Sequence, residues 1–299
     1  MQSVAKRRLQ GVGAVLIAGT GYALMSILVK LAYQLGLNPI QVIALQSWIA
    51  SVILFIYIIL FRRSLLLVGL PTLGLLIVQG IVGALGTSLF YAYSLEFLPV
   101  SVAILLLYLY PAFVLAFSVI IWHKDVSRRE MLAFFLTLAG TALASGVFSG
   151  VNKIAWLGIL LGFSGALAYT VFNILGEIVL AKVTPLAAMC YTQWSCAAAL
   201  LVVVKGDIWG IPWQNVQTWE TGILLATVSS IIPFYLILVG IVRLGADQAS
   251  IISTFELPMT FIMAAIFLKE FPSLYQWIGG GLVMGGILLL NWRIKSNND

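Results

Sequence analysis

The sequence predicts an all-α integral membrane protein whose ten transmembrane helices form two inverted repeats of five. Three observations lead to this prediction. The 299 residues are 62% hydrophobic and only 9% charged, and the mean hydropathy is +1.09, which is far from the balance of a soluble domain. Apolar stretches near the roughly 20 residues that span a bilayer recur along the chain. Residues of the second half also repeat those of the first half at a nearly constant spacing.

The first apolar stretch runs from about Val12 to Tyr33 and follows the basic residues Lys6, Arg7 and Arg8. A basic start before an apolar run resembles a signal peptide, but this run is too long for one, so we expect a retained first helix. The other spans of the first half are expected near residues 40–60, 73–95, 102–121 and 131–148. Those of the second half are expected near residues 156–175, 186–204, 222–242, 249–268 and 275–290.

The positions of the basic residues set the expected orientation. With the N-terminus in the cytoplasm, twelve of the sixteen Lys and Arg residues fall in cytoplasmic segments and four fall at the outer ends. This asymmetry follows the positive-inside rule, so we expect ten spans with both termini in the cytoplasm. The formal charge of +6 does not indicate a nucleic-acid partner, because no basic patch is interleaved with exposed aromatic residues.

The two halves of the chain match each other in order. The matches are Tyr22 with Tyr169 and Pro111 with Pro258 at a spacing of 147, Trp48 with Trp194 at 146, and Lys124 with Lys269 and Gly140 with Gly285 at 145. Ordered matches of Pro, Trp and Tyr indicate an internal duplication. Because five helices per unit is an odd number, the second unit must enter the membrane from the opposite side. We expect these units at residues 1–150 and 151–299, within one membrane domain.

Glu256 lies midway along an apolar stretch, and Pro258 follows it. A carboxylate at the bilayer centre costs about 2.5 to 3.5 kcal/mol, so we expect it to face a protein-lined, partly wet cavity. Pro258 has no N–H for the carbonyl of Thr254, which is expected to leave that acceptor free. Two interpretations stay open. Glu256 could carry a proton or meet a cationic group during transport, or it could be a structural carboxyl held by Ser or Tyr neighbours.

The first and sixth helices are expected to present matched polar faces to this cavity. These faces consist of Tyr22, Ser26 and Lys30 in the first helix and of Tyr169, Asn173 and Glu177 in the sixth. Residues at i, i+4 and i+8 share one side of a helix. Interhelical hydrogen bonds, at about 0.6 to 2 kcal/mol each, are the alternative interpretation. Lys30 and Glu177 are near helix ends, where long side chains reach toward water.

Polar and amphipathic side chains of other helices complete the predicted lining. They are Gln46, Gln193 and Trp194 in the second and seventh helices, Thr87, Tyr91, Ser229, Ser230 and Tyr235 in the third and eighth, and Tyr108 and Tyr110 in the fourth. Trp194 could equally be a packing residue. Pro111, Pro233 and Pro258 are expected to loosen helices that gate the site. The many aromatic residues would suit an aromatic or amphipathic solute.

Pro111 and Pro258 are each followed, twelve to fourteen residues later, by an acidic residue, Asp125 or Glu270, and then by a glycine-bearing helix. With five plus five helices, this pattern resembles the EamA branch of the drug/metabolite transporter superfamily over essentially the whole chain. The resemblance implies a bacterial inner-membrane protein that exports a small metabolite. Members of that branch commonly place Glu directly before the proline of the ninth helix, whereas Leu257 intervenes here.

We therefore expect a secondary transporter that exports a small metabolite, such as an amino acid or an amphipathic or aromatic compound, by alternating access. A channel or a non-transporting membrane scaffold is the alternative. A membrane-embedded enzyme is disfavoured, because His123 is the only histidine and no metal cluster, histidine-paired nucleophile or phosphate-binding loop is present in the sequence. We expect no cofactor and no metal. The expected partners are the substrate, the bilayer and protons as a candidate coupling ion, with the chain acting as a monomer or homodimer.

Overall fold

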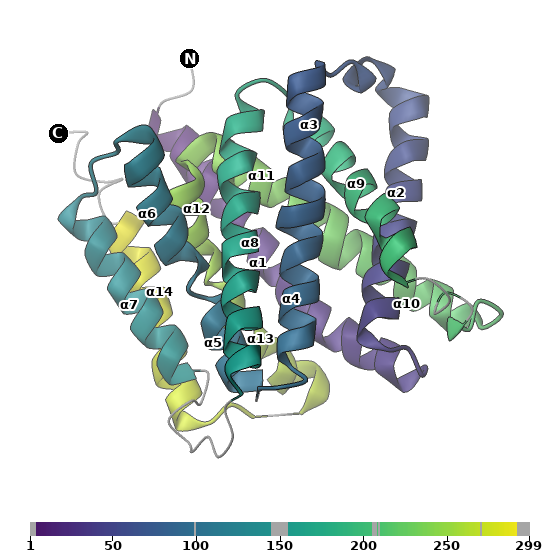
Figure 1. Cartoon of the computed structure of the whole chain (residues 1–299). Coiled ribbons are helices and arrows are strands. Elements are labelled where there is room, and N and C mark those ends of the chain that lie inside the picture. Colours follow the sequence, from purple (N-terminus) through teal and green to yellow (C-terminus); the bar gives the residue numbers. More distant parts are fainter. Residues whose placement is uncertain are drawn as a thin grey trace.

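The computed structural model describes residues 4–98, 100–144, 155–204, 208, 210–269 and 271–291, and all regular structure within those ranges is helical (Figure 1). The spans of the first half are α1 (Val4–Gln34), α2 (Pro39–Phe61), α3 with η2 and α4 (Leu70–Val78, Gln79–Leu85 and Gly86–Ser94), α5 with α6 (Val100–Leu107 and Tyr110–Trp122), and α7 (Arg128–Ala144). A short 3₁₀ helix, η1 (Arg63–Leu66), follows α2.

The second half repeats this order of spans. They are α8 (Trp156–Leu180), α9 (Pro185–Val204), α10 with η5 and α11 (Val216–Ala226, Thr227–Ile231 and Ile232–Leu244), α12 with α13 and η6 (Ala246–Ser253, Glu256–Met263 and Ala264–Leu268), and α14 (Leu274–Asn291). Eight of the spans are long and apolar enough to cross a membrane by themselves. The other two, α7 and α14, are shorter and pack against each other. The prediction of ten helices in two halves is confirmed, while the expected division at residues 150 and 151 lies outside the described residues.

The first residues of three helices show what sets their starts, including two starts that lie earlier than predicted. α10 begins at Val216 rather than near residue 222, because the Asn215 side chain accepts a hydrogen bond from the backbone N–H of Gln217 at 3.0 Å. At α2, Asn38 and Gln41 form a reciprocal capping box, with Pro39 at the first helical position. α1 begins already at Val4, since its basic first turn can extend beyond the apolar core of a bilayer.

The fourth and ninth spans are interrupted at matched places. α5 ends at Leu107 and α6 begins at Tyr110, whereas α12 ends at Ser253 and α13 begins at Glu256. Each break directly precedes a predicted hinge proline, which cannot donate to the carbonyl four residues earlier. The prediction of a free acceptor at Thr254 is wrong, because the backbone N–H of Leu257 donates to that carbonyl at 3.1 Å. The break closes its own hydrogen bonds by tightening to an i+3 turn.

The third and eighth spans each contain a π-helical segment, η2 (Gln79–Leu85) and η5 (Thr227–Ile231), at corresponding places. Such segments are rare and often lie at functional sites. η2 packs against α8, and η5 packs against α1. The widened turns of each half therefore face the first helix of the other half.

The two halves interlock through symmetric contacts. α1 packs on α11 and α13 of the second half, and α8 packs on α4, α5 and α6 of the first half. α2 pairs with α9, and α7 pairs with α14 at one side of the bundle (Figure 1). Each half contributes the same faces to the other, as expected for repeats related by a two-fold axis.

The contact between α7 and α14 shows how close this two-fold correspondence is. A Cβ atom at Gly140 would lie 2.5 Å from the Gly279 carbonyl oxygen and 2.8 Å from the Val283 nitrogen, and one at Gly286 would lie 2.8 Å from the Ala133 carbonyl oxygen. Gly285 has nothing within 4 Å of that position. The structural counterpart of Gly140 is therefore Gly286, at a spacing of 146, and not Gly285 as the sequence matches indicated.

Candidate functional site

A cavity of about 230 Å³ lies between the two halves. Four pairs of matched residues from the two halves line it, namely Tyr22 with Tyr169, Met25 with Phe172, Gln46 with Gln193, and Thr87 with Phe234. All four pairs have the same spacing of 147. The cavity therefore lies on the approximate two-fold axis, where inverted repeats place their substrate sites.

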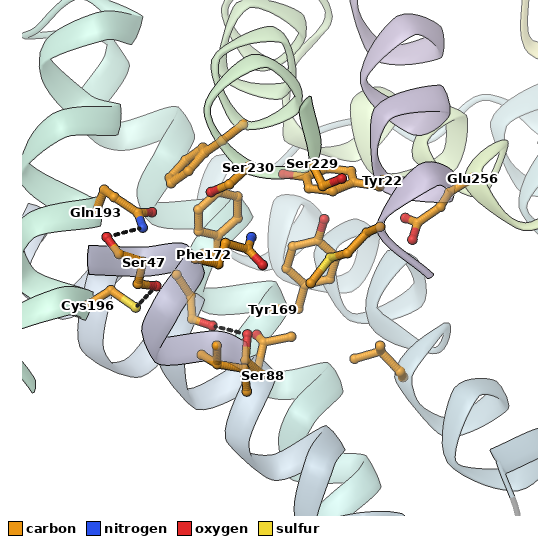
Figure 2. Close-up of a pocket in the computed structure, with 17 residues that line it drawn as sticks. Tyr22, Ser47, Ser88, Tyr169, Phe172, Gln193, Cys196, Ser229, Ser230 and Glu256 are labelled. Atoms are coloured by element: carbon orange, nitrogen blue, oxygen red, sulfur yellow. Dashed lines mark hydrogen bonds between the residues drawn. The ribbon is translucent and has the colours of Figure 1, made fainter. Parts of the chain in front are cut away.

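Glu256 lies at one end of this cavity, opposite Gln193 (Figure 2). It is the first residue of α13, a position where a carboxylate is favoured by the helix dipole. Its backbone carbonyl accepts a hydrogen bond from the Thr260 hydroxyl at 2.8 Å. Among the described residues no group donates a hydrogen bond to its carboxyl oxygens, and no Lys or Arg pairs with them. Within the described ranges the Glu256 carboxyl group therefore lacks the hydrogen bonds and ion pair that usually hold a structural carboxyl.

A second, smaller cavity of about 130 Å³ adjoins the first. Its lining consists of Tyr91, Tyr108, Tyr110 and Tyr169, together with Glu256, Leu107 and Ile104. We call this smaller cavity the tyrosine box. Glu256, Tyr169 and Leu107 line both cavities, so the carboxyl group lies at their junction.

A continuous row of aromatic rings runs from the tyrosine box into the larger cavity. Ring centroids are 6.4 Å apart between Tyr108 and Tyr110, 4.3 Å between Tyr110 and Tyr169, 5.7 Å between Tyr169 and Phe172, and 5.2 Å between Phe172 and Phe234. These distances are typical of packed aromatic pairs. The row forms a fixed apolar wall along both cavities.

The opposite end of the larger cavity is polar. The Gln193 side-chain amide donates to the Ser47 carbonyl at 3.4 Å, and the Ser47 hydroxyl and the Cys196 thiol lie 3.7 Å apart (Figure 2). Gln46 Oε1 and Ser229 Oγ are buried and have no hydrogen-bond partner among the residues that the structure describes. Buried polar atoms without partners are costly, so these two atoms favour a bound polar group or water.

The structure brings most of the predicted site residues together. The larger cavity contains Glu256, Tyr22, Tyr169, Gln46, Gln193, Ser229 and Ser230, and the tyrosine box contains Tyr91, Tyr108 and Tyr110. The proposed hinges Pro111, Pro233 and Pro258 are buried within their helices. The roles of all these residues remain predictions.

Four predicted residues do not line either cavity. Ser26 is an exposed residue whose hydroxyl donates to the Ala23 carbonyl, and the Asn173 amide donates to the Tyr169 carbonyl at 2.8 Å. The other two are Trp194, whose indole N–H donates to the Ser51 carbonyl at 3.1 Å, and Tyr235, which is 39% exposed.

Sequence reasoning missed Met25, Phe172, Ser47 and Ser88, which all line the larger cavity. Met25 and Phe172 follow the matched tyrosines by three residues rather than four. Both residue types are common in apolar helices, so only the repeat spacing of 147 singles them out. In the described ranges no three His, Cys, Asp or Glu side chains gather closely enough to hold a metal ion.

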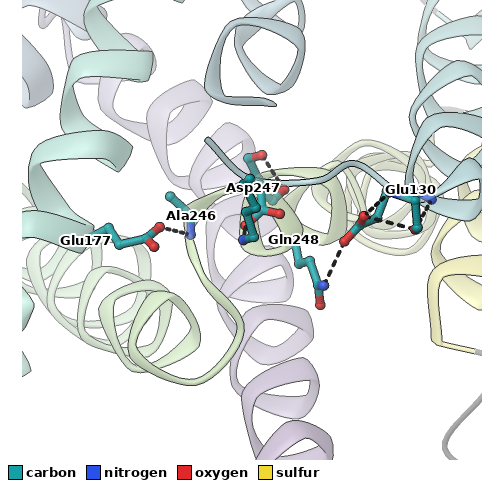
Figure 3. A network of polar contacts seen from close by, with 8 residues as sticks. Glu130, Glu177, Ala246, Asp247 and Gln248 are labelled. Atoms are coloured by element: carbon teal, nitrogen blue, oxygen red, sulfur yellow. Dashed lines mark hydrogen bonds and ion pairs between the residues drawn. The ribbon is translucent and has the colours of Figure 1, made fainter. Parts of the chain in front are cut away.

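A polar network ties the start of α12 to neighbouring helix ends (Figure 3). Lys124 Nζ lies 2.6 Å from Asp247 Oδ1, and Asp247 is only 2% exposed. The Glu177 carboxylate accepts a hydrogen bond from the Ala246 backbone N–H, and the Gln248 amide donates to Glu130 at 3.0 Å. We call this network, formed by Lys124, Glu130, Glu177 and residues 246–248, the latch.

The latch lies on the face where the chain begins. Arg7 donates to the Val242 carbonyl at the end of α11, and Arg8 donates to the Leu290 carbonyl at the end of α14. α12 starts immediately after α11 on that face. The ninth span, which consists of α12, α13 and η6 and carries Glu256, is therefore held at its first turn by α8 and by the segments at either end of the α6–α7 connection.

The model of the EamA-like transporter family matches residues 9–146 and again residues 156–292. The chain belongs to this family. An uncharacterized transporter of Bacillus subtilis, YcbK, is 28% identical over 98% of this chain and 96% of its own length. An uncharacterized transporter of Archaeoglobus fulgidus is 26% identical over 68% of this chain and 71% of its own.

Two further similarities concern the function of a relative and the fold. A probable terminal-alkyne amino-acid exporter of Streptantibioticus cattleyicolor is 21% identical over 65% of each chain. A protein of known crystal structure superimposes with a TM-score of 0.72, covering 95% of this chain and 99% of its own, at 22% identity. That likeness concerns the fold alone. EamA proteins are a transporter family and not an enzyme family, so this chain is a multi-pass membrane transporter of a small-molecule substrate.

Proposed function

We propose that this chain is a secondary transporter that exports a small metabolite, such as an amino acid or an amphipathic or aromatic compound, across a bacterial inner membrane. The observation that carries the proposal is the cavity lined by matched residues of both halves. A site shared by two inverted repeats can be exposed to either side when one half rocks against the other. A channel would need a continuous polar pore, and the row of aromatic rings along this cavity does not provide one.

Alternating access also needs elements that can bend and close. The matched breaks before Pro111 and Pro258 divide the fourth and ninth spans into half-helices. In our proposal these half-helices tilt separately, because the regular i+4 hydrogen bonds of the helix are replaced there by i+3 turns. Pro233 follows the π-helical segment of the eighth span. In our proposal these three prolines mark hinges, and the latch is a gate that closes one face.

The twelve-to-four distribution of basic residues supports a cytoplasmic position for the latch face and both termini. Export of an amino acid or a related compound is supported by the name of the Streptantibioticus relative. Protons are the coupling ion that we propose. Glu256 lies in the cavity without a hydrogen-bond or ion-pair partner for its carboxyl group among the described residues, so it can change its protonation state when substrate arrives or leaves.

A growth-protection screen tests this proposal. Cells that overexpress the native chain are exposed to toxic amino acids, amino-acid analogues and amphipathic amines, and their growth is compared with that of cells carrying an empty vector. We expect protection against one chemical class, because export lowers the internal concentration of the compound. Loaded proteoliposomes that contain the purified protein then measure efflux of the protective compound directly.

Two variants, each of which replaces one glutamate by glutamine, test whether protection depends on the carboxyl group in the cavity. Glu256→Gln removes the carboxyl group in the cavity, whereas Glu220→Gln removes an exposed one near the start of α10. At equal membrane abundance we expect Glu256→Gln to lose protection and Glu220→Gln to keep it. Equal protection by both variants would remove Glu256 from the transport cycle, and an absence of efflux for every protective compound would contradict the transport mechanism.

A further inference from the structure

The tyrosine box combines four phenol rings with one carboxyl group in about 130 Å³. The face of an aromatic ring attracts a cation that lies within about 6 Å of its centre, and sites that bind ammonium ligands use several such faces. Tyr110 and Tyr169 are held by their ring contact, and the Tyr110 hydroxyl donates to the Ser250 carbonyl at 3.1 Å. These two rings are thus held in place before any ligand arrives, which lowers the entropic cost of binding.

The charges of the lining point to a positive ligand. Glu256 is the sole ionisable acid or base, tyrosine and cysteine aside, among the described residues that line the two cavities, and no Lys or Arg lines either of them. Glu256 is half-buried, and a carboxylate inside a protein cavity is stabilised by a compensating charge or by hydrogen-bond donors. An anionic ligand would add a second negative charge beside the first, whereas an ammonium group would supply the missing positive charge.

The larger cavity has room for the rest of such a ligand. Phe172 and Phe234 offer an apolar wall, while Gln46 Oε1 can accept a hydrogen bond that no described residue donates. Ser229 Oγ is likewise buried without a partner. A ligand that extends from the junction at Glu256 into this cavity would meet aromatic rings first and then these polar atoms.

We infer that the substrate is an amine whose ammonium group binds in the tyrosine box against Glu256, while its apolar or aromatic body occupies the larger cavity and donates a hydrogen bond to Gln46. This inference rests on the proposed transport function and narrows its substrate class. An amino group is the part of the substrate that the site recognises, and a carboxylate on the substrate has no counter-charge among the described lining residues.

Calorimetric titration of the purified full-length protein in detergent tests the inference without requiring transport. The probes are 2-phenylethylamine, 2-phenylethanol and 3-phenylpropanoate, which share a ring and differ in charge, together with phenylalanine. We expect 2-phenylethylamine to bind at least about tenfold more tightly than 2-phenylethanol, since one desolvated ion pair contributes a comparable factor. We expect 3-phenylpropanoate to bind more weakly than the alcohol.

Variants separate the contributions of charge and ring. Glu256→Gln should reduce the affinity for 2-phenylethylamine by about tenfold or more and leave the alcohol unchanged, while Glu220→Gln leaves both unchanged. Tyr108→Phe keeps the ring face and should keep most of the amine affinity, whereas Tyr108→Leu should lose about three- to tenfold. Melting of each variant in the same detergent identifies any that fails to fold.

Several outcomes overturn the inference. These are tighter binding of the carboxylate than of the amine, an amine affinity that is unchanged in folded Glu256→Gln, and the absence of amine binding at every concentration reached. Failure of the proposed function gives a different result, namely Glu256-dependent amine binding without efflux of any amine from proteoliposomes. Efflux of neutral or anionic solutes that persists in Glu256→Gln would keep the transporter and reject the amine site. Tight binding of phenylalanine together with the amine supports recognition of the amino group and adds amino acids to the substrate class.

Discussion

The two halves of the molecule share the order of their helices and the places where those helices are interrupted, but they differ in side chains. Both have a π-helical segment in the third span of the repeat and a break in the fourth. Both end that fourth span with a left-handed residue, His123 at φ 48° or Lys269 at φ 57°. At the break, however, the first half places Tyr110 at the start of the half-helix, and the second half places Glu256 there.

This comparison shows how a duplicated fold can acquire an asymmetric site. The shared backbone creates two equivalent half-helix ends that meet the same cavity. One end supplies an aromatic ring and the other supplies a carboxyl group. In the amine site that we propose, the ammonium group lies between these two residues, which occupy matching positions in the two halves. The latch is asymmetric as well, because the residue that matches Asp247 at a spacing of 147 is Val100, which cannot form an ion pair.

The largest expected effect tests which residues of the two halves are true counterparts. Gly140→Ala and Gly286→Ala should each destabilise the protein by about 2 to 3 kcal/mol, because the new methyl group meets backbone atoms of the facing helix that cannot move aside. Gly285→Ala should be neutral or stabilising by at most about 1 kcal/mol, since that position faces open space and Ala favours the helix. Thermal melting in detergent measures all three.

Similar melting of Gly140→Ala and Gly285→Ala would contradict the two-fold correspondence at a spacing of 146. Sequence matching alone favoured 145 here, because it aligned Lys124 with Lys269 and Gly140 with Gly285. The chain has 27 glycines, and Gly285 and Gly286 are adjacent. An alignment that is wrong by one residue therefore still pairs Gly140 with a glycine. Only the facing backbone, which tolerates no side chain at Gly140 or Gly286, distinguishes the two alignments.

The second prediction concerns the latch, which has an ion pair at Asp247 and no equivalent at Val100 in the first half. In a background of Cys190→Ala and Cys196→Ala, a Ser253→Cys reporter lies between the latch and the cavity, on α12. Asp247→Asn should increase the rate of labelling by a maleimide added at the latch face about fivefold, because it removes the ion pair with Lys124 that, in our proposal, holds α12 closed. Lys124 is 37% exposed, so solvent screening keeps the expected effect modest.

The matched control for the latch is Asp125→Asn, which removes an exposed carboxyl group next to Lys124. We expect its labelling rate to equal that of the reporter alone. The exchanged pair Lys124→Asp with Asp247→Lys should restore slow labelling at least in part. If Asp247→Asn and Asp125→Asn label equally fast, the ion pair does not act as a gate, and the asymmetry between Asp247 and Val100 has no conformational consequence.

The third prediction separates the two half-helix ends. Tyr110→Phe removes the hydrogen bond to the Ser250 carbonyl, which should cost about 1 kcal/mol of stability, but it keeps the ring and should change amine affinity less than about twofold. Tyr235→Phe, at a position that is 39% exposed, is the control and should change neither. Loss of amine binding in folded Tyr110→Phe would show that the hydroxyl group, and not the ring, contacts the ligand.

Some features of the candidate site could be predicted from the sequence and others could not. Pro111 and Pro258 each follow a break in their span, as the missing backbone donor of a proline in a helix leads one to expect. The hinge role of these two residues and of Pro233 stays a prediction. Glu256 was predicted to face a cavity because a carboxyl group is costly in lipid, and the structure places it there. The π-helical segments were not predicted, since one extra residue per turn leaves no mark in an apolar sequence.

The matched polar faces were predicted only in part. Tyr22 and Tyr169 line the cavity, but the residues that accompany them are Met25 and Phe172, three positions later. A step of four residues turns about 40° beyond a full circle and a step of three stops about 60° short of it, so the two steps lead to opposite sides of the tyrosine. The polar residues lie four positions after each tyrosine and were therefore predicted to face the cavity. The cavity lies instead on the side of the residues three positions after each tyrosine.

The smallest expected effects on stability and amine affinity come from Ser26 and Asn173, the two residues that were wrongly predicted to line the cavity. Ser26 and Asn173 are matched at a spacing of 147, yet Ser26 is exposed and Asn173 is buried with its amide donating to the Tyr169 carbonyl. Asn173→Ala should cost about 0.5 to 1 kcal/mol through the lost hydrogen bond, and Ser26→Ala less than about 0.5 kcal/mol. Neither should change the affinity for 2-phenylethylamine more than about twofold, since neither lines the cavities. A larger loss of affinity in folded Ser26→Ala would mean that the substrate path includes the exposed face of α1, so that the polar face read from the sequence marks an entrance to the site rather than its wall.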